Sequence, residues 1–112
     1  MICISILEKT PAACLEAMKG EEFVEIRLEE MELGKGDMER LFSNKKVAAI
    51  ATCRPGKISD EERKKRLLEA IAAGAAYVDV EVDAPEDVAR EVVAAAKKKG
   101  CRAVVSYHNF EK

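Results

Sequence analysis

The chain has 112 residues, of which 48% are hydrophobic and 36% are charged, so its length and composition fit one domain with a buried core. Its formal net charge of -2 lacks the clustered basic excess that is typical of nucleic-acid binding. No apolar run approaches the roughly 20 residues of a membrane helix, and no secretory signal pattern is present. We therefore expect a cytoplasmic protein that binds neither nucleic acid nor membrane.

The first predicted elements alternate between strand and helix. A short apolar, β-branched run over residues 1–7 predicts a strand. Thr10, followed by proline, is typical of a helix start, because a capping hydroxyl precedes a proline in the first turn. A second strand is predicted over 23–28, and Asp37 is expected to cap a short helix over 38–43.

The second half continues this alternation. A third strand is predicted over 47–53, where a Pro-Gly pair ends it. Ser59, with Glu62 three residues later, forms a capping-box pattern that predicts a helix start. The remaining predicted elements are a strand over 77–82, a helix between Asp83 and Gly100, and a strand over 103–107.

The resulting order is βαβαβαβαβ in one domain over residues 1–112. The connections are too long for hairpins, so the pattern predicts a parallel α/β sheet covered by helices with right-handed crossovers. Repeated βα units suit half of a (βα)8 barrel, but an open, flavodoxin-like sheet would share them.

Polar side chains gather in the later half of each predicted strand. Because alternate residues of a strand share a face, Glu25 and Arg27 lie opposite the valine and isoleucine of their strand. Ser5, Arg54 and His108 fall at comparable places in the first, third and fifth strands. Parallel α/β sheets form their sites at the carboxyl ends of strands. The arginines favour a carboxylate-bearing ligand, and the histidine suits proton transfer near neutral pH.

Each of these residues also has a purely structural interpretation. Glu25 and Arg27 suit an ion pair that only neutralises two charges, and Arg54 suits an ordinary surface arginine. His108 alone is more often structural than catalytic. The charged run over 61–66 is most simply the solvated face of a helix.

No motif for a metal or cofactor is present. The four cysteines form no CxxC pair and the chain holds one histidine, so we expect no metal site. The cysteines are better explained as small buried side chains in a reducing compartment. The sequence contains no dinucleotide-binding or phosphate-binding glycine motif and no serine-hydrolase elbow, and we expect no cofactor.

Four short motifs in order carry a resemblance to a known family. They end the second to fifth predicted strands, and together they resemble the type I 3-dehydroquinate dehydratases of the shikimate pathway over essentially the whole chain. The motifs are Val24-Glu25-Ile26-Arg27, Thr52-Cys53-Arg54-Pro55, Tyr77-Val78-Asp79-Val80-Glu81 and Ser106-Tyr107-His108-Asn109-Phe110.

The resemblance implies a (βα)8 barrel that dehydrates 3-dehydroquinate to 3-dehydroshikimate through a Schiff base with a lysine. On this pattern His108 matches the general acid/base. Glu25 and Arg27 match the pair that contacts substrate hydroxyls and orders the site. Arg54 matches a substrate-binding arginine, and Ser5 matches a first-strand serine at the binding site.

Two departures from the family pattern qualify this expectation. Many members carry Glu-Gly-Gly after the third-strand arginine, whereas this chain has Gly56-Lys57-Ile58 after Pro55. A barrel of this kind needs roughly 200 residues or more, and the Schiff-base lysine is expected on the strand after the fifth. We therefore expect an N-terminal half-barrel that is inactive alone and forms a homo-oligomer through exposed sheet edges. The alternatives are a non-catalytic α/β folding or interaction unit and a small anion-binding regulator.

Overall fold

The computed structural model describes residues 3–81 and 84–106, with only the backbone described at residue 106. Within these residues, five strands alternate with four α-helices, and one 3-10 turn follows the second strand. The elements are β1 (Ile4–Ile6), α1 (Pro11–Met18), β2 (Phe23–Arg27), η1 (Leu28–Glu30), α2 (Asp37–Phe42), β3 (Ala48–Thr52), α3 (Asp60–Ala73), β4 (Tyr77–Glu81), α4 (Glu86–Lys99) and β5 (Arg102–Ser106).

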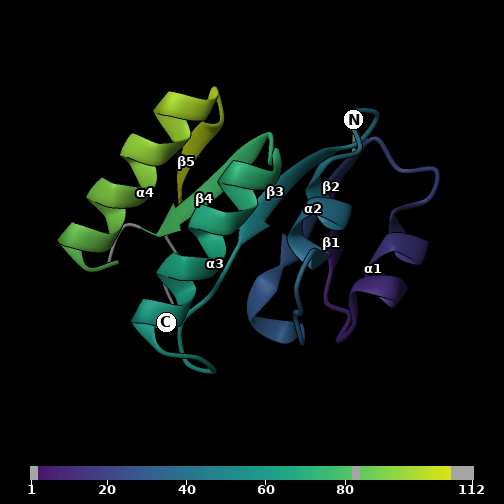
Figure 1. Cartoon of the computed structure of the whole chain (residues 1–112), viewed down its shortest axis with the longest axis horizontal. Helices are drawn as coiled ribbons and strands as arrows, with labels where there is room; N and C mark the ends of the chain where they lie inside the picture. Colours follow the sequence, from purple (N-terminus) through teal and green to yellow (C-terminus); the bar gives the residue numbers. More distant parts are fainter. Residues whose placement is uncertain (1–2, 82–83, 107–112) are drawn as a thin grey trace, which may run out of the picture.

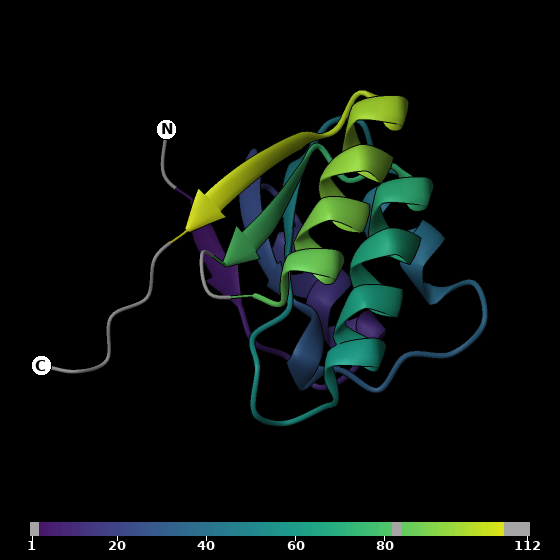
Figure 2. The ribbon, with the colours of Figure 1, turned by 90° about the vertical axis from the view of Figure 1, so that its left-hand side faces the viewer.

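The sheet is parallel throughout, and its spatial order is the chain order, β1-β2-β3-β4-β5. The helices form one layer on one face of the sheet (Figures 1 and 2). A flavodoxin-like sheet reverses its strand order and carries helices on both faces. The flavodoxin-like alternative is therefore wrong for this chain, and the arrangement is that of an arc of a (βα)8 barrel.

The core lies between the helix layer and one face of the sheet. A row of paired residues crosses the sheet from Ile6 through Ile26 and Ala51 to Val78, and each is at most 3% exposed. Residues of the helices, including Val92, close this layer. Burial on this face and polarity on the other explain why the strands alternate instead of being apolar throughout.

The opposite face of the sheet is divided into an apolar and a polar part. Near the amino ends of the strands, the rings of Phe23 and Tyr77 pack 5.6 Å apart between centroids. Two and four residues further along the same strands, the side chains become charged: Glu25 and Arg27 on β2, Asp79 and Glu81 on β4. The polar groups thus lie toward the carboxyl ends, as the sequence predicts.

Two of the predicted helix caps are confirmed, and one is wrong. The hydroxyls of Thr10 and Ser59 accept hydrogen bonds from backbone N–H groups at the starts of α1 and α3. Gly36, not Asp37, is the N-cap of α2. Asp37 is already inside the helix, and its carboxylate accepts the N–H of Gly34 at 2.6 Å. Asp83, at which the last helix is predicted to open, lies outside the described residues.

Both edge strands expose apolar side chains. Leu7, just after β1, is 51% exposed, and Val105 of β5 is 67% exposed. The described helices cover the outer face of β2, β3 and β4, whereas Ala103 and Val105 on the same face of β5 remain exposed. None of the described helices is long and apolar enough to cross a membrane.

The two long helices end at glycines whose surroundings differ. Gly74 has a φ of 116°, and a Cβ there would lie 3.0 Å from the carbonyl oxygen of Phe42. Gly100 has a φ of 76°, with no atom within 4 Å of such a Cβ. We predict that Gly100→Ala lowers the free energy of unfolding by about 1 kcal/mol and Gly74→Ala by roughly 2–3 kcal/mol, as measured by urea denaturation. Equal losses would show that the Phe42 contact relaxes at no cost.

Candidate active site

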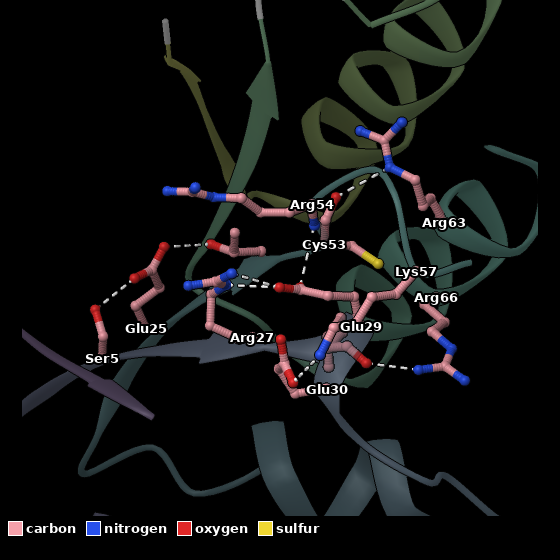
Figure 3. A network of polar contacts seen from close by, with 12 residues as sticks. Ser5, Glu25, Arg27, Glu29, Glu30, Cys53, Arg54, Lys57, Arg63 and Arg66 are labelled. Atoms are coloured by element: carbon pink, nitrogen blue, oxygen red, sulfur yellow. Dashed lines mark hydrogen bonds and ion pairs between the residues drawn. The ribbon is translucent and has the colours of Figure 1, made fainter. Parts of the chain in front are cut away.

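Four of the five predicted site residues meet at the carboxyl edge of the sheet. Ser5 lies on β1, Glu25 and Arg27 lie on β2, and Arg54 follows β3 (Figure 3). They are brought together by the parallel register, which sets Ser5 directly beside Glu25. The fifth predicted residue, His108, lies outside the described residues.

The Glu25 carboxylate is fixed by hydroxyls from the strands on both sides. Ser5 donates its Oγ–H to Glu25 Oε1 at 2.6 Å, and Thr52 donates its Oγ1–H to Glu25 Oε2 at 2.9 Å. Thr52 is 1% exposed, whereas Ser5 is exposed. These bonds hold both carboxylate oxygens and leave each with further capacity to accept a hydrogen bond.

Arg27 pairs with Glu29 and not with Glu25. Its Nε donates to Glu29 Oε2 at 2.8 Å, and a terminal nitrogen lies 2.6 Å from the same oxygen. The other oxygen of Glu29 accepts the backbone N–H of Arg54 at 3.1 Å. The proposed Glu25–Arg27 ion pair is therefore wrong, because the turn after β2 brings a second carboxylate closer to the guanidinium.

Neighbouring carboxylates stabilise the protonated, positively charged form of Arg27. Burial acts to lower the pKa of Arg27, but the hydrogen bond and charge of Glu29, together with the charges of Glu25 and Glu30, raise it above its ordinary value. The guanidinium is thus a permanent cation beside the Glu25 carboxylate.

Glu29 and Glu30, which lie on η1, are site residues that the sequence did not predict. Glu29 is 7% exposed, and Glu30 pairs with Lys57 at 2.7 Å across the β2 and β3 loops. Lys57's hydrogen bond lowers the pKa of Glu30 below its ordinary value. One signal was available: Glu29 stands two residues after Arg27, the spacing that places two side chains on one face if the strand continues.

Two arginines of α3 hold the loops that carry the site. Arg66 donates to the carbonyl oxygens of Leu28 at 2.5 Å and Met31 at 3.0 Å, which belong to the first residue of η1 and to the residue that follows it. Arg63, 6% exposed, donates to the carbonyl oxygen of Cys53 at 3.1 Å. The interpretation of 61–66 as one solvated face is therefore wrong for these two residues. At 3.6 residues per turn, a run of six residues covers every side of a helix.

A cavity of about 230 Å³ opens at the carboxyl ends of β2, β3 and β4. It is lined by Arg27, Glu29, Glu30, Arg54, Pro55, Lys57 and Glu81. Three cations and three carboxylates therefore face one small volume, which suits a polar ligand that bears both hydroxyls and a negative charge.

The cysteines have no place in this chemistry. Burial, followed by the charge of Glu29, raises the pKa of Cys53 to about 12, so its thiol stays protonated and is a weak nucleophile. All four cysteines are free; Cys14, Cys53 and Cys101 are buried as expected, whereas Cys3 is exposed, so the expectation of buried cysteines is wrong for Cys3. Within residues 3–81 and 84–106, no cluster of three or more His, Cys, Asp or Glu has the arrangement of a metal site.

A family model described as Type I 3-dehydroquinase matches residues 2–112. Curated relatives named 3-dehydroquinate dehydratase include proteins from Desulfotalea psychrophila, 31% identical over 121 residues, and Methanococcus vannielii, 34% identical over 125 residues. These matches cover 98% and 100% of this chain but 52% and 55% of the relatives. The chain thus spans about half the length of the curated relatives it matches.

Solved structures show the same relationship. The 3-dehydroquinate dehydratase from Enterococcus faecalis matches with a TM-score of 0.77 and 25% identity, over 98% of this chain and 54% of that one. The type I enzyme from Clostridium difficile, solved with covalently modified comenic acid, matches the fold with a TM-score of 0.82 at 23% identity, over 98% of this chain and 51% of that one. The expected half of a (βα)8 barrel is confirmed.

Glu29 is expected to be the most costly carboxylate to remove from this edge. In Glu29→Ala, the Arg27 side chain, 17% exposed, and the Arg54 N–H lose their acceptor. We predict a loss of roughly 2–3 kcal/mol in the free energy of unfolding, somewhat less than for a fully buried pair.

The matched control is Glu16→Ala. Glu16 pairs with Lys19, and both side chains are about three-quarters exposed, at 74% and 75%. This change is expected to cost less than about 0.5 kcal/mol. Urea titrations of the two variants check the prediction, and comparable losses would contradict it.

Proposed function

This chain belongs to the type I 3-dehydroquinase family, and we propose that it carries the N-terminal half of a 3-dehydroquinate dehydratase site in a single half-barrel domain over residues 1–112. The reaction is the removal of water from 3-dehydroquinate to give 3-dehydroshikimate. The family resemblance implies that it proceeds through a Schiff base between the substrate ketone and a lysine.

The observation that carries this proposal is the fixed Glu25 carboxylate. Its two oxygens are oriented by Ser5 and Thr52, and Arg27 stands on the same strand and face. A carboxylate whose position is set before binding accepts a hydrogen bond from a ligand hydroxyl without a further entropic cost of ordering its side chain. This suits 3-dehydroquinate, which carries several hydroxyls beside its ketone.

Arg54 and Arg27 supply the positive charge of the site. Both line the cavity next to the Glu29 carboxylate. We assign Arg54 to substrate binding, and Arg27 to ordering Glu25 and contacting the substrate. Their fixed guanidinium groups favour an anionic ligand over a neutral one.

His108 is proposed as the general acid/base. In this role it assists imine formation and hydrolysis and moves the proton lost in the elimination. The lysine that forms the imine is expected on a strand after β5. Residues 1–112 alone are therefore proposed to bind 3-dehydroquinate weakly without turning it over, because the covalent imine is the electron sink of the reaction.

The exposed edges support a further proposal, that the chain associates with itself. Val105 and Leu7 lie at opposite edges of the sheet, and both are more than half exposed. Parallel edge strands present unpaired N–H and C=O groups to a neighbour. We also propose a cytoplasmic location, in keeping with four free cysteines and with relatives named 3-dehydroquinate dehydratase.

The purified chain should bind 3-dehydroquinate without forming product. Titration calorimetry measures binding, and the ultraviolet absorbance of the conjugated product measures turnover. We expect Glu25→Gln to weaken binding about tenfold, because it removes the charge of the acceptor. The exposed Glu22→Gln is the matched control and should leave binding unchanged.

Borohydride reduction tests independently whether a lysine of residues 1–112 forms the imine. Reduction in the presence of substrate should leave the mass of the chain unchanged. A substrate adduct in the mass spectrum, or clear product formation, would overturn the proposal that these residues are inactive alone. Absence of any binding would overturn the assignment of the site.

Self-association is tested by size exclusion with light scattering. We expect a dimer or larger assembly, and Val105→Lys should shift it to monomer by placing a charge on the β5 edge. The control Ala94→Lys adds the same charge at an exposed position of α4. A monomeric wild-type chain at high concentration would contradict the proposal.

A further inference from the structure

The peptide group between Cys53 and Arg54 is hydrogen-bonded at both of its polar ends. Its carbonyl oxygen, on Cys53, accepts a hydrogen bond from Arg63 Nε at 3.1 Å, and its N–H, on Arg54, donates to Glu29 Oε1 at 3.1 Å. Figure 3 shows these two partners on opposite sides of the chain, as the C=O and N–H of one trans peptide group require. The plane of this peptide is therefore fixed by side chains from two other elements.

Arg63 is itself held in place as a donor. Its side chain is buried, and its Nη1 donates to Asp60 Oδ1 at 2.8 Å, within the first turn of α3. Because the guanidinium group is planar, fixing one of its nitrogens sets the directions of the others. Cys53 is buried as well, so water has little access to replace Arg63 as the donor to its carbonyl oxygen.

The same helix also fixes the N–H end of the peptide, by a longer route. Glu29, which accepts that N–H, lies on η1, and Arg66 of α3 donates to the carbonyl oxygens of Leu28 and Met31 in and after this turn. Arg63 and Arg66 are three residues apart, so they project from the same side of α3. One helix thus orders both partners of the peptide.

The orientation of this peptide sets the direction in which the Arg54 side chain leaves the backbone. Arg54 lines the cavity at the carboxyl ends of the strands, and Pro55 follows it. The proline ring fixes its own φ and restricts the backbone of the residue before it to extended conformations. Little backbone freedom therefore remains at Arg54, which has a fixed peptide plane on one side and a proline on the other.

We propose that Arg63 is a positioning residue for Arg54: by holding the Cys53 carbonyl oxygen, it directs the Arg54 side chain into the cavity and thereby raises the affinity of the site for its ligand. A guanidinium group that is oriented before binding costs less entropy to engage. The inference rests on the proposed function, in which Arg54 binds substrate. Arg63 does not line the cavity, so it acts on a ligand only through Arg54.

A purely structural role for Arg63 makes a different prediction. If Arg63 serves only to pair with Asp60 at the start of α3, its loss lowers the free energy of unfolding and leaves Arg54 as it is. Asp60→Asn separates the two roles, because it removes the ion pair and keeps the Arg63 donor. The Asp60 side chain is 58% exposed, so this change leaves no buried group without a partner.

The first measurement needs no ligand. Hydrogen exchange at the Arg54 backbone N–H, followed by NMR, reports on the fixed peptide, and the amides of β2 report on any global loss of stability. We expect Arg63→Met to speed exchange at Arg54 about tenfold beyond the change at β2. Asp60→Asn and the control Arg90→Met, which breaks an exposed pair on α4, should change it less than about twofold.

The second measurement is the affinity for 3-dehydroquinate by calorimetry. We expect Arg63→Met to weaken binding about fivefold and Arg54→Met to weaken it about tenfold. The double variant should bind no more weakly than Arg54→Met alone, because Arg63 acts only through Arg54. Additive losses, or equal losses in Arg63→Met and Asp60→Asn, would overturn the inference.

A conservative variant keeps the test decisive if Arg63→Met does not fold, which circular dichroism verifies. Arg63→Lys keeps the charge but replaces the rigid planar group with one flexible ammonium group. We expect it to change exchange and affinity in the same directions as Arg63→Met and by smaller factors. Unchanged exchange at Arg54 together with unchanged affinity would contradict a positioning role.

Failure of the proposed function gives a different result. If the wild-type chain does not bind 3-dehydroquinate but Arg63→Met still speeds exchange at Arg54, the proposed ligand is wrong and the positioning of Arg54 by Arg63 is supported. If the wild-type chain binds and Arg63→Met changes neither exchange nor affinity, the site stands and only the inference about Arg63 is overturned.

Discussion

Parallel pairing of the strands in chain order is the constraint on which the rest of the structure depends. It places the carboxyl ends of β1, β2 and β3 at the same end of the sheet. Because the helices cover only one face, that face is buried in the core and the opposite face carries the site (Figure 2). Alternate residues then go either to the core or to the site. Ile26 is fully buried under the helices, and its neighbours Glu25 and Arg27 are directed by the same register to the opposite face.

Charges at this edge are acceptable because they compensate one another. An unpaired charge with little access to water would cost several kcal/mol. Glu29 joins the Arg27 guanidinium to the Arg54 backbone, while Arg66 of α3 donates to carbonyl oxygens that precede and follow Glu29 in the chain. The helix layer thus positions the site as well as covering the core. Glu25 is held separately by hydroxyl groups, and among the residues that the structure describes no cation forms a direct ion pair with it.

Local signals in the sequence predicted the elements well. Strand alternation, capping residues such as Thr10 and Ser59, and helix-ending glycines act within a few residues of the element that they define. Most of the described strands and helices lie within one or two residues of the predicted boundaries, whereas β1 and α4 begin three residues later than predicted. The same alternation predicted that Ser5, Glu25, Arg27 and Arg54 lie at one edge of the sheet, because parallel strands bring equivalent positions together.

The partners of these residues were decided only by the tertiary structure. Glu29 and Glu30 face the cavity because the chain turns at η1, and nothing in the local pattern separated that turn from a continuing strand. Arg66 is 38 residues from the Leu28 carbonyl to which it donates. By itself the sequence determined the elements, the face on which each strand carries its charges, and a resemblance to one family. The tertiary structure decided the strand order and the pairing of those charges, because both depend on contacts between residues that are distant in the chain.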